Sequence, residues 1–153
     1  MAERDNHRVQ VFTLDGKTIL TFGSRGKEDG QLECPTHVAV TENNSYVVSD
    51  SANNRLVMFD NSGSYVKHVG VMGTGAGEFK KTSGVVVDNE GYIIAGDFYN
   101  HRVQVFSPDL SQVTVFGEEG KDDINFKFPT GITLNNEGRV IVADRYNHRV
   151  QIF

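Results

Sequence analysis

The protein is a chain of 153 residues with 38% hydrophobic and 23% charged residues, a composition that excludes a disordered tail and fits a folded globular protein. Its net charge of −5 disfavours attraction to nucleic acid or to an anionic membrane. The apolar runs are too short to cross a membrane, and the charged residues at the start do not form an apolar signal segment. Cys34 is the only cysteine, so no intrachain disulfide is possible. We therefore expect a cytoplasmic protein.

One heptapeptide recurs along the chain. Asn-His-Arg-Val-Gln-Val-Phe occupies residues 6–12 and 100–106, returns at 147–153 with Ile152, and recurs in a looser form at 53–59. The closing phenylalanines are always 47 residues apart, at Phe12, Phe59, Phe106 and Phe153. A constant period of this length predicts one supersecondary unit that is used repeatedly.

Short runs rich in β-branched residues, separated by Gly, Asn, Asp and Pro, predict strands joined by tight turns. In chain order, residues 1–23 supply two strands, residues 35–70 and 82–117 supply four each, and residues 129–153 supply three, which makes thirteen. The strands expected in the two full units are 37–40, 46–50, 54–59 and 65–70, then 84–87, 92–96, 101–106 and 113–117.

Four short antiparallel strands per period of 47 residues predict the blades of an all-β propeller. We name the strands of a blade a to d, outward from the propeller axis. The first segment of the chain then supplies strands c and d, and the last segment supplies a, b and c. The a runs are almost wholly apolar, so strand a is expected to be buried on both faces.

The repeated unit closely resembles the NHL repeat. The resemblance includes Pro-Thr-Gly-Ile at 129–132, Val-Ala-Asp at 142–144, the Asn-His-Arg-Val-Gln strand, and Phe-Gly at 22–23 and 116–117. NHL domains are typically six-bladed propellers, often within TRIM-NHL ubiquitin ligases and Brain tumor-like translational repressors. The resemblance therefore implies half of a six-bladed ring. The chain has no RING-type cluster of cysteine and histidine, so no ligase activity of its own is expected.

Three periods are too few to close a propeller, which typically has about 4–8 blades. The start of the chain supplies strands c and d, while its end supplies a and b and another copy of c. Two chains joined head to tail would thus share two hybrid blades, which predicts a homodimer that closes a six-bladed ring and leaves one surplus strand c at each junction. The alternatives are a fragment of a longer propeller and a designed or truncated half-propeller scaffold.

Polar residues that recur in every unit are interpreted as architecture. In each unit an arginine follows an acidic residue by five positions, and an Asp that closes strand b can accept turn hydrogen bonds or pair with arginine. This structural set is Asn6, Arg8, Asp50, Arg55, Asp97, Arg102, Asp144 and Arg149. The motif histidines have the same interpretation, and Asn54 replaces one of them, which argues against a ring of metal ligands.

No feature of the chain predicts catalysis. The glycine-rich stretch 73–77 lacks the Lys-Ser/Thr end of a phosphate loop, and Cys34 has no base beside it in the sequence. We therefore expect no catalytic residue, no metal and no cofactor.

The residues that differ between units lie mainly in the b–c and d–a loops. In a propeller these loops share the top face, which we call the loop face. Aromatic side chains beside cations in such loops could stack on bases or on peptide side chains. The candidate partner-binding residues are Phe98, Tyr99, Arg145, Tyr146, Lys80, Lys81, Arg25, Lys27 and Lys127. The alternative is that the aromatic rings pack against neighbouring loops.

These observations predict a non-catalytic interaction module whose loop face binds a protein partner, as in substrate recruitment by TRIM-NHL ubiquitin ligases. The negative net charge and the mixture of acids and bases in the loops favour a protein over a nucleic acid. Single-stranded RNA binding for mRNA repression is the alternative function, because related propellers bind such RNA on that face.

Overall fold

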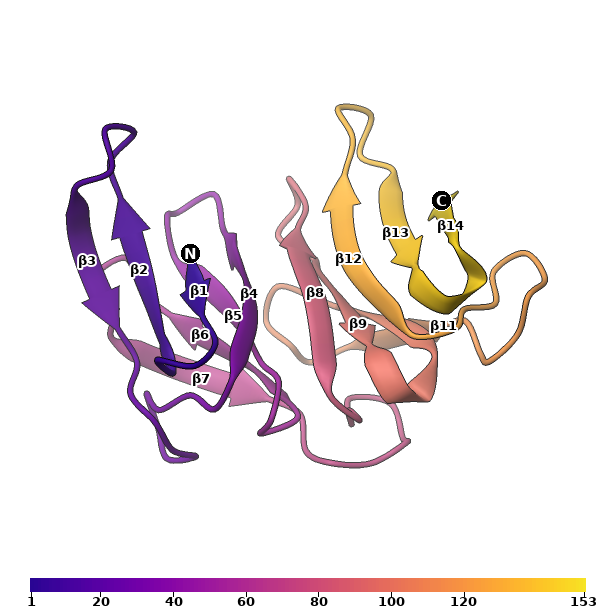
Figure 1. The fold of residues 1–153 in the computed structure, drawn as a ribbon, viewed down its shortest axis with the longest axis horizontal. Helices are drawn as coiled ribbons and strands as arrows, with labels where there is room; N and C mark the ends of the chain where they lie inside the picture. The colour runs from indigo at the N-terminus through magenta and orange to yellow at the C-terminus, as the bar shows by residue number, and fades with distance from the viewer.

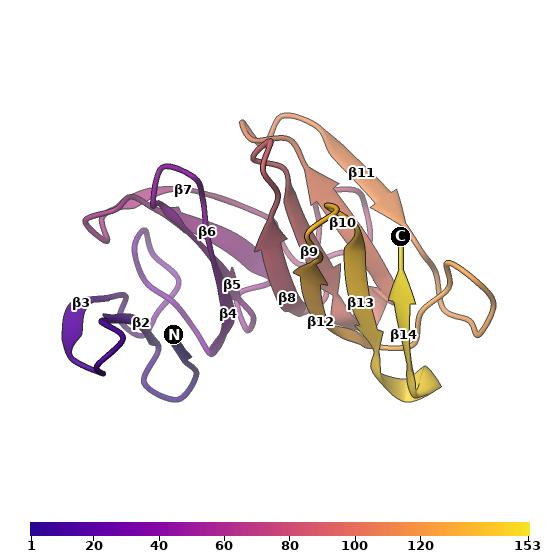
Figure 2. The same cartoon turned by 90° about the horizontal axis from the view of Figure 1, so that it is seen from above.

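The computed structural model describes residues 1–153 and contains fourteen strands and two short 3₁₀ helices. The strands form four antiparallel sheets, with four strands in each of the two central sheets and three in each outer sheet. Figure 1 shows the sheets fanned in chain order, from β1–β3 at one side to β12–β14 at the other. Seen from above in Figure 2, β8 and β12 lie near the middle of the fan, while β7 and β11 lie on its outer rim. The fold is thus the all-β propeller that the repeat predicts.

The elements follow the 47-residue period. The first sheet is β1 (Ala2–Glu3), β2 (Arg8–Phe12) and β3 (Thr18–Phe22), and the second is β4 (Pro35–Val40), β5 (Tyr46–Asp50), β6 (Arg55–Phe59) and β7 (Tyr65–Val69). The third sheet is β8 (Thr82–Val87), β9 (Ile93–Asp97), β10 (Arg102–Phe106) and β11 (Val113–Phe116), with η1 (Phe98–Asn100) after β9. The fourth is β12 (Pro129–Leu134), β13 (Val140–Asp144) and β14 (Arg149–Ile152), with η2 (Arg145–Asn147) after β13.

The count of thirteen strands is wrong by one. Ala2 and Glu3 form β1, which pairs antiparallel with β2 in the register Ala2↔Val9 and Glu3↔Arg8. Glu3 lies 47 residues before Asp50, so β1 is the last part of a strand b. A pair of residues shows no alternation of apolar and polar side chains, which is why the sequence pattern missed it.

The expectation that strand a is buried on both faces is also wrong for two of the three inner strands. Along β4 and β12 buried residues alternate with half-buried or exposed ones, and Val40 is 56% exposed. The b strands β5 and β9 are the most buried instead. The a strands lie on the axis side of each sheet, where half a ring leaves one face open, whereas b has neighbouring strands on both sides.

The inner strands approach one another closely around β8. The Ser83 hydroxyl donates to the Pro129 carbonyl oxygen at 2.8 Å, which joins β8 to β12. A Cβ atom on Gly84 would lie 2.5 Å from the Thr130 carbonyl oxygen, so only glycine fits there. This contact explains why β8, alone among the inner strands, is buried over its first four residues.

Three apolar clusters fill the spaces between consecutive sheets. Each cluster contains one fully buried residue from a d–a loop, and these three residues are 47 positions apart: Leu32, Phe79 and Phe126. A buried Leu or Phe side chain contributes roughly 1.5–3 kcal/mol relative to an exposed one. These side chains therefore anchor the long loops to the core.

Each junction of the predicted homodimer would hold two copies of strand c, β2 of one chain and β14 of the other, and β2 is paired on both sides. It forms hydrogen bonds with β1 and with β3, and its Val9 is 1% exposed within the core. A hybrid blade would have to displace β2 of one chain or β14 of the other, so the homodimer stays a prediction. None of the helical segments has the length and hydropathy of a membrane-crossing helix.

Candidate interaction site on the loop face

The d–a and b–c connections lie together on the loop face. In Figure 1 the connections through η1 and η2 lie toward the bottom of the view, and the β8–β9 and β12–β13 turns lie toward its top. We call the face formed by the a–b and c–d turns the turn face. The two faces are therefore separate surfaces at opposite ends of the inner strands.

The recurring Asp and Arg residues form a buried clamp on the loop face. In the third sheet, Asp97 is fully buried and accepts hydrogen bonds from the Lys80 amide, from Asn100 Nδ2 and from Arg102 Nε, each at 2.8 Å. Arg102 also donates to the carbonyl oxygen of Gly75 at 2.7 Å. Both charges are thus fully engaged in holding the d–a loop against the sheet.

The same contacts recur in the neighbouring sheets. Asp50 pairs with Arg55 at 2.7 Å, and Asp144 pairs with Arg149 at 2.8 Å. Asn53 Nδ2 and Asn147 Nδ2 each donate to a loop carbonyl oxygen at 2.8 Å, so Asn53 belongs to the set although the sequence analysis did not name it. In all three complete clamps, side chains of the motif fasten a loop rather than reach toward solvent.

In the first copy of the motif, Asn6 and Arg8 make only local contacts. Arg8 Nε lies 3.0 Å from Glu3 Oε2, and Asn6 Nδ2 lies 2.5 Å from the same oxygen. Arg8 donates to no loop carbonyl oxygen, and its side chain is 39% exposed. Arg8 and Asn6 therefore pair with Glu3 but do not fix a d–a loop.

The motif histidine acts as a hydrogen-bond acceptor across blades. His7 Nδ1 accepts from the Cys34 amide and His101 Nδ1 from the Phe128 amide, both at 3.2 Å. Where asparagine replaces histidine, Asn54 Oδ1 accepts from the Lys81 amide at 2.7 Å. The imidazole nitrogen and the amide oxygen thus serve the same purpose, which explains the substitution.

The residues whose amides donate these hydrogen bonds have a left-handed backbone. The φ angles are 50° at Cys34, 65° at Lys81 and 57° at Phe128, values that are uncommon for residues other than glycine. All three lie at the same position of the period, just before strand a. The repeat therefore holds one variable side chain per blade in a fixed place on the loop face.

An aromatic cluster lies on the loop face of the third and fourth sheets. Phe128 lies between the rings of the two b–c loops, with centroids 5.0 Å from Phe98, 5.9 Å from Tyr99 and 4.9 Å from Tyr146. Phe98 and Phe128 are half-buried, whereas Tyr99 and Tyr146 are 52% and 53% exposed. Packing between loops therefore accounts for the phenylalanines, and the tyrosines still present half of their surface to solvent.

Cations flank these rings. Lys81 Nζ lies 5.2 Å from the Phe98 centroid and 5.5 Å from the Tyr99 centroid, and the Arg145 guanidinium lies 5.4 Å from the Tyr146 ring. The structure thus gathers five of the predicted residues into one cluster and adds Phe128, which the sequence analysis missed. The signal that could have found Phe128 is its spacing of 47 residues from Lys81.

The other predicted cations lie outside the aromatic cluster. Arg25 forms an exposed ion pair with Glu33 at 3.6 Å, and Lys27 is exposed. Lys127 adjoins the cluster only through its backbone, since its carbonyl oxygen accepts from the Tyr146 amide at 3.0 Å. Lys80 faces a neighbouring cavity instead.

That cavity, of about 570 Å³, opens on the loop face beside the aromatic cluster. Its lining contains Tyr99 and three cationic side chains, Arg4, Lys80 and Lys81, and no acidic residue. Although the loops as a whole carry mixed charges, this cavity is cationic. No cluster of three or more histidine, cysteine or acidic side chains that could hold a metal ion is found in the structure.

Residues 25–125, about two thirds of the chain, match the protein family described as 6-bladed beta-propeller. The chain belongs to the six-bladed β-propeller family. Residues 126–153 match the NHL repeat, which confirms the resemblance carried by the Asn-His-Arg motif.

Similar proteins agree with this membership. A stretch of 48 residues is 40% identical to protein brain tumor of Drosophila melanogaster and covers 31% of this chain and 5% of that protein. A streptogramin B lyase structure matches 99% of this chain and 46% of its own, with a TM-score of 0.73 at 12% identity. The virginiamycin B lyase of Staphylococcus aureus matches 99% of this chain and 50% of its own, with a TM-score of 0.64 at 14% identity. At these identities the likeness to the lyases shows the propeller fold alone, and this chain spans about half of each.

Proposed function

We propose that the protein is a non-catalytic interaction module whose loop face binds an acidic segment of a partner protein. The observation that supports this most directly is the cavity lined by Arg4, Lys80, Lys81 and Tyr99 without any carboxylate. Three cations around one concave site attract carboxylates. A tyrosine at its edge supplies a rigid amphipathic contact that loses little entropy on binding.

The backbone around the cavity is already in place for binding. The Asp97 clamp and the Asn54 acceptor fix the loop that carries Lys80 and Lys81. A site that is ordered before it binds spends less of its interaction energy on ordering. The 40% identity to protein brain tumor over 48 residues supports a role of the kind that NHL propellers have in larger regulatory proteins, such as recruitment of a substrate for ubiquitination.

Single-stranded RNA is the second candidate partner. The half-exposed rings of Tyr99 and Tyr146 beside Lys81 and Arg145 favour it, because base stacking on aromatic rings next to cations is the common mode of single-strand binding. The net charge of −5 weighs against a broad RNA surface.

A titration with two probes tests both candidates. Hexaglutamate and pentauridine are added separately to the ¹⁵N-labelled full chain at low salt, and amide shifts are followed. The proposal expects hexaglutamate to shift amides at Thr36, Ala52 and Met72, and Lys81→Glu to abolish that effect. Lys27→Glu is the matched control, since Lys27 lies on the same face outside the cavity. Preferential binding of pentauridine that Tyr99→Ala removes would favour RNA, and no response to either probe would overturn both candidates.

A further inference from the structure

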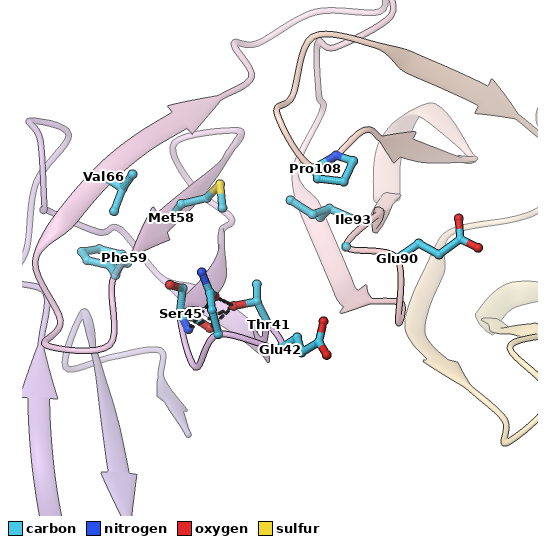
Figure 3. Close-up of a pocket in the computed structure, with 11 residues that line it drawn as sticks. Thr41, Glu42, Ser45, Met58, Phe59, Val66, Glu90, Ile93 and Pro108 are labelled. Carbon is cyan, nitrogen blue, oxygen red and sulfur yellow. Dashed lines mark hydrogen bonds between the residues drawn. The ribbon is translucent and has the colours of Figure 1, made fainter.

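A second cavity, of about 550 Å³, opens on the turn face between the second and third sheets. Figure 3 shows Met58, Phe59 and Val66 on one side of it and Ile93 and Pro108 on the other. Glu42 and Glu90 also line it, from the β4–β5 and β8–β9 turns. We call this cavity the turn-face groove.

The floor of the groove is apolar and continuous with the core. Phe59 and Ile93 are each 1% exposed, and Met58 packs against the core cluster between the two sheets. Val66 extends this apolar surface outward and is 52% exposed. The thioether of Met58 is flexible and polarizable, so it can adapt to the shape of an inserted side chain.

Two contacts hold the groove in shape, one within the third sheet and one between the second and third sheets. Gly91 has a φ of +87°, and a Cβ atom there would lie 3.2 Å from Pro108 Cγ, so the β8–β9 turn packs directly on the next turn. Lys67 Nζ donates from β7 to the Asp109 carbonyl oxygen at 3.1 Å. The groove is therefore bounded by turns of both sheets rather than open along its whole length.

The turns of this face carry an excess negative charge equal to the net charge of the protein. Its turns, 13–17, 41–45, 60–64, 88–92, 107–112 and 135–139, contain seven acidic and two basic residues, a balance of −5 that equals the total for the chain. The acidic residues are Asp15, Glu42, Asp60, Asp88, Glu90, Asp109 and Glu137, and the basic residues are Lys17 and Arg139. The rest of the protein is neutral overall, so a cationic partner is attracted to this face.

Hydrogen bonds favour the ionised form of two turn-face acids. The Ser107 hydroxyl and the Ser111 amide and hydroxyl lower the pKa of Asp109 to about 2. The Ser62 hydroxyl and the Ser64 amide likewise lower the pKa of Asp60. Asp60 and Asp109 therefore keep their negative charge at any physiological pH.

We propose that the turn-face groove binds an extended protein segment in which an aliphatic side chain lies next to lysine or arginine. The aliphatic side chain would occupy the apolar floor, while the cation would pair with Glu42 or Glu90. The methylene groups of lysine and arginine also cover apolar walls while their charge stays in water. The negative charge of the face disfavours nucleic acid and anionic lipid. This surface is independent of the cationic cavity on the loop face, so one propeller would select partners of opposite charge at its two ends.

Two synthetic peptides test the proposal, acetyl-Leu-Lys-Leu-Lys-amide and its counterpart with glutamate in place of lysine. The ¹⁵N-labelled full chain is titrated with each, and the dissociation constant is taken from amide shifts. The lysine peptide should shift amides at Val66, Gly91 and Ile93, and the glutamate peptide should not. Replacing both Glu42→Lys and Glu90→Lys should weaken binding by about tenfold or more, and raised salt should weaken it further.

Glu137→Lys is the matched control, because Glu137 occupies the position of Glu90 one period later but lies outside the groove. It should change the affinity less than about twofold, because Glu137 does not line the groove and solvent and salt screen its charge. Val66→Ser tests the apolar part and should weaken binding without disturbing the core. The proposal would be overturned if Glu137→Lys weakened binding as much as the Glu42→Lys and Glu90→Lys pair, or if the glutamate peptide bound as tightly as the lysine peptide. Amide shifts confined to the loop face would overturn it as well. Lys81→Glu should leave this binding unchanged, which separates it from the proposed loop-face function.

Discussion

The loop face and the turn face arise from the same 47-residue repeat but are held in place differently. On the loop face, the buried Asp97 and the largely buried Arg102 reach from a sheet to a long d–a loop. On the turn face each turn fastens itself, as where Asp60 Oδ1 accepts from the amides of Ser62 and Ser64 at 2.9 Å. Long connections need anchors from elsewhere in the fold, whereas short turns satisfy their backbone locally. The two faces can therefore carry different surface chemistry on one scaffold.

Among the substitutions that test this comparison of the two faces, Asp97→Ala should lower the free energy of unfolding the most. It leaves the Arg102 guanidinium, whose side chain is 11% exposed, without its acidic partner, and it removes the acceptor of the Lys80 amide. The free energy of unfolding should fall by about 3–5 kcal/mol, as it does when one partner of a buried ion pair is lost. Urea denaturation measures the loss. Asp60→Ala is the control on the turn face and should lower the free energy of unfolding by only a small fraction of that amount. Equal losses for the two variants would show that the loops and the turns are stabilised to the same extent by these aspartates.

Acid should weaken the loop-face clamps. Burial raises the pKa of Asp144, but hydrogen bonds from the Lys127 amide, Asn147 and Arg149 outweigh burial and lower the pKa below its ordinary value of 3.8. A carboxyl whose pKa is lowered by folding stabilises the protein above that ordinary value, and the stabilisation is lost as the pH falls through the lowered pKa. The free energy of unfolding, measured in urea from pH 7 to pH 2, should therefore decline below about pH 4.

Asp144→Asn provides the control for this acid effect. The variant cannot titrate at this position, so its free energy of unfolding should be lower at neutral pH and should decline less steeply below about pH 4. An unchanged slope would assign the acid sensitivity to other groups.

His101→Ala should lower the free energy of unfolding by a moderate amount. It removes the acceptor of the Phe128 amide and places alanine where φ is 57°, so a loss of about 1–2 kcal/mol is expected. His101→Asn should cost less than half as much, since asparagine already serves this purpose at Asn54. Thermal unfolding compares the two variants. Equal losses would mean that the hydrogen bond is not what the histidine supplies.

Arg25→Ala should have the smallest effect. Its ion pair with Glu33 is 3.6 Å long, and the two side chains are 74% and 34% exposed. Solvent screening leaves such a pair worth less than about 0.5 kcal/mol, so thermal unfolding should be nearly unchanged. A larger loss would show that charges at the surface of the loop face also hold its loops, which would narrow the contrast with the buried clamps.

Much of the fold was predictable from local pattern. The period, the turn residues and the short apolar runs placed β5 at Tyr46–Asp50 without error and the other strands of the two full units within two residues. The misses have physical causes. β1 is too short for a periodic signal, and strand burial depends on which neighbouring sheets are present rather than on the apolar content of a strand.

The candidate site was predictable only in part. Phe98, Tyr99 and Tyr146 stood out because aromatic residues are unusual in turns. Phe128 did not stand out, since nothing in its neighbourhood indicates that it lies between two loops from different blades. The cationic cavity was hidden because Arg4 and Lys80 are 76 positions apart in the sequence.

By itself, the sequence determined the repeat, the propeller fold, all strands but β1 and most of the clamp residues, because these depend on spacing within one unit. Only the tertiary structure decided which loops meet, that a cavity without acids lies among loops of mixed charge, and that Glu42 and Glu90 border an apolar groove. Those properties arise between blades, where residues one or two periods apart become neighbours. The repeat specifies the structure of one unit. The charge and shape of a surface depend instead on the side chains by which the units differ, because packing places side chains of different units next to one another.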